Sequence, residues 1–264
     1  MADRIVTDLS DVRLRSGMGA AITTEFLQMN SFDTCSWSDD FMGGDLLADV
    51  YTSASGSGAT AFAVLTPTAS ANEWGNVRLV TGSTVNIGGA LSLGLQCKGD
   101  YNAVMAVRYR TSSAANLHLE IGFRDTVADS TSTVTDIDAR TFDGDDGVCW
   151  AYNTAGSQDV WEALGNKDGT PSSKLTLTNN ADSSNGALPI ADTYQTMVVA
   201  MMEDNAYFMR YSADGRKQGE TLMITDTQNG SVNLAPCIYV QGKSAGASKN
   251  IDVDFFKVWQ LRRS

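Results

Sequence analysis

The closing segment of the chain carries two aspartates at positions i and i+2, Asp252 and Asp254, in the stretch NIDVDFF. Two carboxylates on one side of a strand could share acid–base chemistry or hold a metal ion. However, no third carboxylate and no histidine lies near them in the sequence. We therefore interpret both as the polar side of a closing strand. The polarity of that strand switches at Phe255–Phe256, which a β-bulge there, or a strand that leaves a sheet edge for the core, would explain.

Glycoside hydrolysis is the acid–base chemistry that two carboxyl groups would serve, because it needs a pair about 5–9 Å apart across the sugar bond. The chain contains the glutamates Glu25, Glu73, Glu120, Glu162, Glu203 and Glu220. None is followed by an acid two or four residues later. Glu120 has Asp125 five residues on, but its strand ends before that aspartate. The sequence therefore predicts no enzyme, with a glycoside hydrolase as the third hypothesis.

The sequence contains few residues that could serve nucleophilic catalysis or bind zinc. The single histidine, His118, lies in the middle of an expected strand, opposite its apolar side, where a solvent-facing or hydrogen-bonded role is expected. The four cysteines Cys35, Cys97, Cys149 and Cys237 are far apart and form no C-x-x-C pair. We expect them to be small buried residues in a reducing compartment, although their spacing leaves two disulfides open.

An acid-dense stretch, DGDDG, supplies three candidate calcium ligands: Asp143, Asp145 and Asp146. The stretch does not fit an EF-hand loop, because Gly147 and Thr154 occupy the fifth and twelfth positions. A loop calcium site of another pattern and a turn of solvated acids both remain open. Calcium is thus the one cofactor that the sequence leaves in question.

Aromatic residues near expected loops are candidates for stacking on sugar rings. Trp74, Tyr152 and Trp161 lie near loops or strand ends, and acids flank Trp161 closely. Trp150 lies within an apolar stretch and is expected in the core. The sequence therefore predicts Trp161, Trp74 and Tyr152 as a glycan-binding set, with Trp161 the best surface candidate.

Composition and charge narrow the classes of partner. The 264 residues carry a formal net charge of −12, which argues against nucleic acid because phosphate binding needs a basic surface. No apolar run approaches about 18 residues, and the first 30 residues do not have the pattern of a secretory signal. We expect no membrane insertion and synthesis in a cytoplasm.

Period-2 alternation is the main structural signal along the chain. In residues 104–110, Met105, Val107 and Tyr109 share one side, and LHLEIGFR (117–124) places its apolar and polar residues on opposite sides. Residues 194–216 read as a hairpin, and further strands are expected at 146–154, 234–243 and 250–262. The Ser/Gly-rich stretch 52–60 is expected to be a surface loop.

These strands predict an all-β fold, a two-sheet antiparallel jelly-roll sandwich. Residues 31–264 form the expected sandwich domain. Residues 1–30 show neither helical nor strand period and are expected to be an N-terminal arm for anchoring or assembly, with a first strand and a disordered tip as the alternative.

The order of strands after residue 100 resembles that of the concanavalin A-like, laminin-G-like jelly roll. The stretches AVMAVRYR, EIGFRD, DGVCWAYNT, LAPCIYVQG and IDVDFFKVWQLR carry the likeness. More narrowly, the chain resembles jelly-roll virion proteins of tailed bacteriophages. That resemblance implies a homo-oligomer, with a trimer favoured, in contact with capsid or tail subunits.

Three functions follow in order of preference. The first is a non-enzymatic virion structural protein, assembled in the host cytoplasm, that decorates the capsid and docks through its N-terminal arm. The second is a carbohydrate-binding adhesin or tail-fibre receptor-binding module that contacts host-surface glycans. The third is the hydrolase. The sequence does not separate a capsid from a tail location and does not identify the host.

Overall fold

The structure is a computed structural model of the whole chain. It describes residues 34–41, 50–64, 75–94, 96–126, 132, 134–155, 160–176, 188–245 and 248–261. The expected N-terminal arm (1–30) and Trp74 lie outside the described residues. Within the described ranges, no helix has the length and apolar character needed to cross a membrane.

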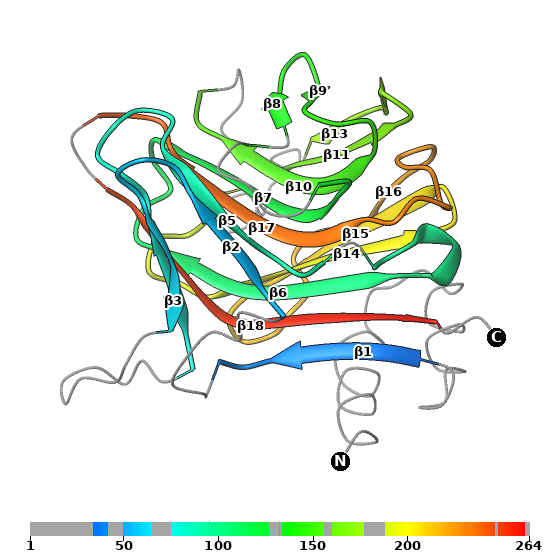
Figure 1. Cartoon of the computed structure of the whole chain (residues 1–264), viewed down its shortest axis with the longest axis horizontal. Helices are drawn as coiled ribbons and strands as arrows, with labels where there is room; N and C mark the ends of the chain where they lie inside the picture. The colour runs from blue at the N-terminus through cyan, green and yellow to red at the C-terminus, as the bar shows by residue number, and fades with distance from the viewer. Residues whose placement is uncertain are drawn as a thin grey trace.

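The described strands form two large antiparallel sheets, as predicted (Figure 1). In spatial order, sheet A contains β16 (Leu222–Ile224), β15 (Asn205–Tyr211), β14 (Gln195–Met202), β6 (Val104–Thr111), β18 (Asn250–Leu261), β4 (Val77–Val80) and β3 (Thr60–Val64), with β1 (Thr34–Asp39) paired to β18. The predicted hairpin is β14–β15, joined by a turn at Glu203 and Asp204.

Sheet B is the second layer of the sandwich. Its order is β12 (Thr170–Pro171), β11 (Glu162–Lys167), β10 (Gly147–Asn153), β7 (Leu117–Arg124), β17 (Ala235–Gly242), β5 (Gly88–Ser92) and β2 (Thr52–Ser55), with β13 (Leu175–Thr176) paired to β11. A small hairpin, β8 (Val134–Asp136) with β9 (Thr141–Phe142), lies beside sheet B on the side away from sheet A (Figure 1). One short 3-10 helix, η1 (Gly99–Tyr101), precedes β6.

The core lies between the two sheets and follows the predicted alternation. Met105, Val107 and Tyr109 of β6 face it, as do the odd-numbered residues of β7. The polar side of β7 is also buried, contrary to the expectation of a half-exposed strand. Val134, Ile137 and Phe142 of the β8–β9 region pack on the outer face of sheet B and cover it.

The stretch 52–60 is a loop only in part, at residues 56–59. Thr52–Ser55 forms β2, which pairs with β5 at the edge of sheet B. An edge strand needs no apolar period, because one side of its backbone and much of its surface face water. The local composition therefore looks the same for a polar edge strand and for a loop.

Of the two explanations for the polarity switch in β18, the structure shows the β-bulge, one or two residues earlier than expected. The register of β18 against β6 shifts between Val253 and Phe255, so Asp254 is the extra residue. Val253 and Phe256 both face the core as a result, and Phe255 lies on the outer face of sheet A. Val253 and Phe255 therefore lie on opposite faces, although their i, i+2 spacing predicts one shared face in a regular strand.

Asp252 and Asp254 lie on the outer face of sheet A and pair with arginines. Asp252 is buried and bonds to Arg78 of β4 (Nε–Oδ1 2.5 Å) and to Arg110 of β6 (Nη2–Oδ2 2.8 Å). Its neighbours across both strand pairs are these same two arginines, so the three side chains form one row over three strands. Asp254 pairs with Arg108 (Nη1–Oδ2 2.5 Å). The two aspartates thus form ion pairs across neighbouring strands.

We predict that Asp252→Asn lowers the free energy of unfolding by about 2–3 kcal/mol, because two guanidinium groups lose a shared, buried carboxylate. Asp254→Asn is the matched control. Its ion pair with Arg108 is about a quarter exposed, so its loss should cost about 1 kcal/mol or less. Urea unfolding of both variants measures the difference, and equal losses would contradict the assigned role of Asp252.

Candidate functional site

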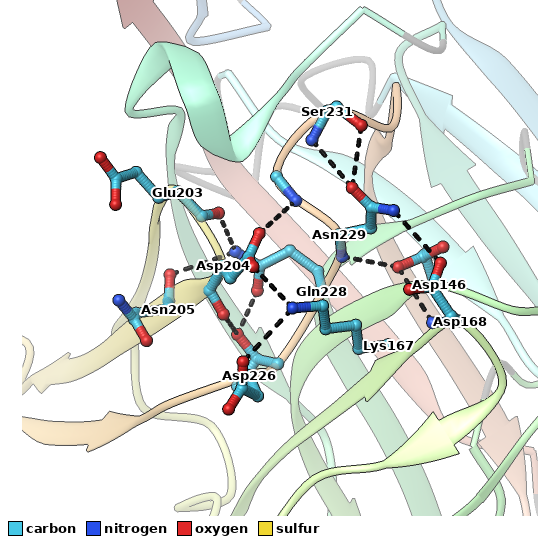
Figure 2. Close-up of polar contacts among 12 residues, drawn as sticks. Asp146, Lys167, Asp168, Glu203, Asp204, Asn205, Asp226, Gln228, Asn229 and Ser231 are labelled. Carbon is cyan, nitrogen blue, oxygen red and sulfur yellow. Dashed lines mark hydrogen bonds and ion pairs between the residues drawn. The ribbon is translucent and has the colours of Figure 1, made fainter.

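Four turns meet at one end of the sandwich and form a polar group that we call the turn cluster (143–146, 168–169, 203–204 and 226–231). Figure 2 shows their side chains directed at one another's backbone. Asp146 Oδ1 accepts a hydrogen bond from the Asn229 backbone N–H at 2.7 Å. Asp204 Oδ1 accepts one from the Gly230 N–H at 2.8 Å. Gln228 Nε2 donates to the carbonyl of Glu203 at 2.7 Å.

A single lysine balances part of this acidic end. Lys167 Nζ lies 2.6 Å from Asp204 Oδ2 and 3.3 Å from Asp226 Oδ1. The hydrogen bond from Lys167, helped by the Gly230 N–H, lowers the pKa of the Asp204 carboxyl. Desolvation raises the pKa of Asp146 instead, against the opposing effect of its two backbone hydrogen bonds. The acids of the turn cluster therefore fix loop geometry.

The structure does not bring the calcium candidates together as a set of ligands. Asp143 and Asp145 are exposed, whereas Asp146 is buried and turned toward Asn229. Asp125 accepts the backbone N–H groups of Asp145 and Asp146 and so shapes this turn. Across the described ranges, no group of three or more His, Cys, Asp or Glu residues has the arrangement of a metal site.

The expected surface position of Trp161 is wrong. Trp161 is 0% exposed and Tyr152 is 2% exposed, so neither can stack on a sugar from solvent. Trp161 directly precedes β11, where Glu162 faces outward, so the alternation directs the indole between the sheets. There it packs edge-on against Tyr109 and Trp150, and at a tilt against Tyr152. Trp150 is in the core, as predicted.

His118 is buried and hydrogen-bonded on the outer face of sheet B. Its Nε2 lies 2.7 Å from Glu120 Oε1, which also accepts the Val134 N–H at 2.8 Å. Glu162 lies in the same cross-strand row as Glu120, with Ala151 between them. Its Oε1 pairs with Lys174 Nζ at 2.9 Å. Both glutamates are thus buried and already bonded to neighbouring groups.

The described residues line a groove of about 540 Å³, which we call the Trp37 groove. It lies where β1 and β18 of sheet A approach β2 and β5 of sheet B. Its described lining consists of Cys35, Ser36, Trp37, Val50, Thr52, Leu93, Gly94, Gln96, Cys97, Val258 and Gln260. None of these side chains is an acid or a base of the Asp, Glu, Lys, Arg or His type.

The strands hold the polar groups of the Trp37 groove in fixed positions. Trp37 Nε1 donates to the Tyr51 hydroxyl at 2.9 Å, and the two rings meet edge to face. Gln260 Oε1 accepts the Lys98 N–H at 3.2 Å, and Gln260 Nε2 donates to the Gln96 carbonyl at 2.8 Å. Trp37 is half-buried, so part of its ring is open to the groove. An indole beside amide and hydroxyl groups can bind an uncharged ligand that is rich in hydroxyl groups.

Two cysteines border the same groove with different exposure. Cys35 is exposed, contrary to the expectation that all four cysteines are buried, whereas Cys97, Cys149 and Cys237 are buried. Burial, and secondarily the nearby Cys35, raises the pKa of the Cys97 thiol to about 12. Cys97 therefore stays a neutral thiol near pH 7.

Sequence reasoning missed Trp37 as a site residue. The serines on either side of it, Ser36 and Ser38, were the available signal for a strand with a wet surface. The groove itself could not be inferred, because its walls come from segments about 60 and about 220 residues further along the chain.

Comparison with known proteins supports the fold. No protein-family model matches the chain, and no curated protein matches its sequence. Peanut lectin superposes with a TM-score of 0.55 at 10% identity, covering 88% of this chain and 100% of the lectin. The exoplasmic/lumenal domain of VIP36, bound to Ca²⁺ and Man3GlcNAc, gives 0.51 at 13% identity, with 87% and 89% covered.

A phage protein has a similar structure. The CBM2 module of the evolved Dit of Lactobacillus casei BL23 phage J-1 superposes with a TM-score of 0.52 at 14% identity, covering 88% of this chain and 98% of the module. The described sandwich therefore has the concanavalin A-like lectin fold. These identities establish the fold alone.

The turn cluster makes a prediction about pH. The folded-state pKa of Asp204 lies below its ordinary value of 3.8, so the ionised carboxylate stabilises the fold above that value. This contribution is lost as the pH falls through the folded-state pKa. Asp204→Asn should therefore lower the free energy of unfolding near pH 7, and its difference from the wild type should shrink between about pH 5 and about pH 2.

Chemical unfolding over this pH range measures the effect. Asp226→Asn is the control, because the Asp226 side chain is 78% exposed and its contact with Lys167 is longer. It should differ little from the wild type at any pH. A loss for Asp204→Asn that is as large at about pH 2 as at about pH 7 would contradict the assigned ion pair.

Proposed function

We propose that this chain is a carbohydrate-binding domain that holds an uncharged saccharide in the Trp37 groove. The observation that carries the proposal is the groove itself: about 540 Å³, bordered by a half-buried indole and by uncharged hydrogen-bonding side chains. Small-ligand sites typically occupy about 300–1,000 Å³ and combine apolar walls with a few fixed polar groups. The groove has this size and this character.

The chemistry of the lining favours a sugar over an apolar ligand. Leu93 and Val258 are buried and close the apolar base of the groove, whereas the half-buried indole of Trp37 is the surface on which the C–H face of a pyranose could rest. Thr52, Gln96 and Gln260 supply donors and acceptors for hydroxyl groups. Lectins that share this fold, among them peanut lectin and sugar-bound VIP36, add support of a general kind.

We further propose that the domain acts on a tailed-phage particle, as a module that recognises a host-surface glycan. The likeness to the phage J-1 CBM2 module supports this placement over capsid decoration, for which no specific observation speaks. On this proposal residues 1–30 attach the domain to other virion proteins. The favoured trimer remains an expectation from the family resemblance.

The proposed function is binding without catalysis. Glu120 and Glu162 are the two carboxylates that share a row on sheet B, and each is held by a cationic or hydrogen-bonding neighbour. The β8–β9 region covers the surface between them. A general acid and a base need access to the sugar bond, which this arrangement does not offer.

A glycan array probed with the full chain tests binding, followed by titration calorimetry with each glycan that binds. Trp37→Ala should weaken the affinity at least about tenfold, because it removes the stacking surface. Trp259→Ala is the matched control, since Trp259 is half-exposed on the outer face of sheet A. Gln260→Ala gives a milder second test that leaves the core intact. Equal affinities for the wild type and both groove variants would exclude this groove.

Hydrolysis of the bound glycan tests the non-catalytic part. We expect no release of reducing ends by the wild type, and no difference for Glu120→Gln. Release by the wild type that is lost in Glu120→Gln, with glycan binding retained, would show that the domain is a glycosidase.

A further inference from the structure

The outer face of sheet A carries a cluster of basic side chains at one end, away from the Trp37 groove lining. The cluster consists of Arg78 of β4 and Arg108 and Arg110 of β6. Their side chains are 27%, 30% and 21% exposed, so all three reach solvent in part. We call them the arginine cluster.

Tyr194 joins two of these arginines through its ring. The guanidinium carbon of Arg108 lies 4.5 Å from the ring centre, and that of Arg110 lies 5.2 Å from it. The Tyr194 hydroxyl donates to Asn76 Oδ1 at 2.9 Å, which fixes the ring. An aromatic face bordered by guanidinium groups is a rigid surface, because the hydrogen bond and the cation–π contacts hold its parts.

The cluster places three guanidinium groups close together on one face of sheet A. Two carboxylates, Asp252 and Asp254, form ion pairs with them. Asp252 is buried beneath the side chains of Arg78 and Arg110, so guanidinium groups lie between it and solvent. The cluster therefore presents guanidinium groups on a chain whose formal net charge is −12.

Neutralising Asp252 does not require the whole cluster. Arg78 already bonds to both oxygens of Asp252, and Arg110 bonds to its Oδ2. Arg108 bonds only through Nη1 to Asp254, and within the described ranges its Nε and Nη2 make no hydrogen bond. An ion pair as exposed as this one contributes little to stability. The stability of the fold therefore does not explain why Arg108 and Tyr194 occupy these positions.

We propose that the arginine cluster is a second binding site, which takes the carboxylate of an acidic sugar. Arg108 binds the carboxylate through its Nε and Nη2 edge, the fork geometry that guanidinium groups use for carboxylates. The sugar ring rests against Tyr194. Asp254 competes with the ligand for Arg108. The site is separate from the Trp37 groove and does not depend on it.

The test measures binding of an oligogalacturonide, a chain of uronic acids, by titration calorimetry at about 0.15 M salt. Arg108→Gln should weaken the affinity about tenfold. Asp254→Asn should strengthen it, because the competing carboxylate is lost. A merely structural ion pair does not account for that opposite sign. Thermal unfolding confirms that each variant is folded.

The controls separate this site from general charge effects and from the groove. Arg216→Gln removes the same charge from a side chain that is 87% exposed and paired with Asp214, and it should leave the affinity unchanged. Trp37→Ala should also leave it unchanged, whatever that variant does to uncharged glycans. Neutral dextran should not bind the cluster.

Four outcomes would overturn the proposal. The first is no binding of the oligogalacturonide by the wild type. The second is an equal loss in Arg108→Gln and Arg216→Gln, and the third is no gain in Asp254→Asn. Dextran sulfate that binds all variants as tightly as the oligogalacturonide would show unspecific attraction and would also overturn it.

Discussion

The ion-paired closing strand β18 is the constraint on which the rest of the structure depends. β18 pairs with β6 and β4 along its first part and with β1 beside β6 along its second. Asp252 ties it to both flanking strands, and the bulge at Asp254 then turns the strand by one residue. Because of that shift, Ile251, Val253, Phe256 and Val258 all reach the core.

Both proposed binding surfaces take their geometry from this strand. Val258 and Gln260, beyond the bulge, form one wall of the Trp37 groove. Asp252 precedes the bulge and Asp254 lies at it, and both aspartates position the arginine cluster. The residues that first suggested a catalytic or metal-binding pair therefore act by fixing side chains on neighbouring strands.

Much of the fold could be predicted from the sequence because alternation is a local property. The order of residues predicts which side of β6 and of β7 faces the core. It also predicts the β14–β15 hairpin and the irregularity in β18. The covering of sheet B was not, because the β8–β9 region packs there through Val134 and Ile137, which carry no local sign of their partners. Polar β2 gave no period to detect.

The candidate site was largely beyond such reasoning. Trp161 was placed at the surface because acids flank it, but one position in the alternation decides whether a side chain faces water or the core. The aspartates of the DGDDG stretch looked like cation ligands. Asp146 instead accepts a hydrogen bond from a backbone N–H of a distant turn. The Trp37 groove joins three distant segments, and only the paired strands show that they meet.

The most direct test of the central claim is to locate a bound glycan by NMR. A ¹⁵N-labelled sample titrated with an uncharged glycan that binds should shift the signals of the Trp37 indole N–H and the Gln96 and Gln260 side-chain amides. The indole signals of the core residues Trp150 and Trp161 should stay unchanged. Shifts confined to the turn cluster or to the β8–β9 region, with the Trp37 groove signals unmoved, would contradict the account.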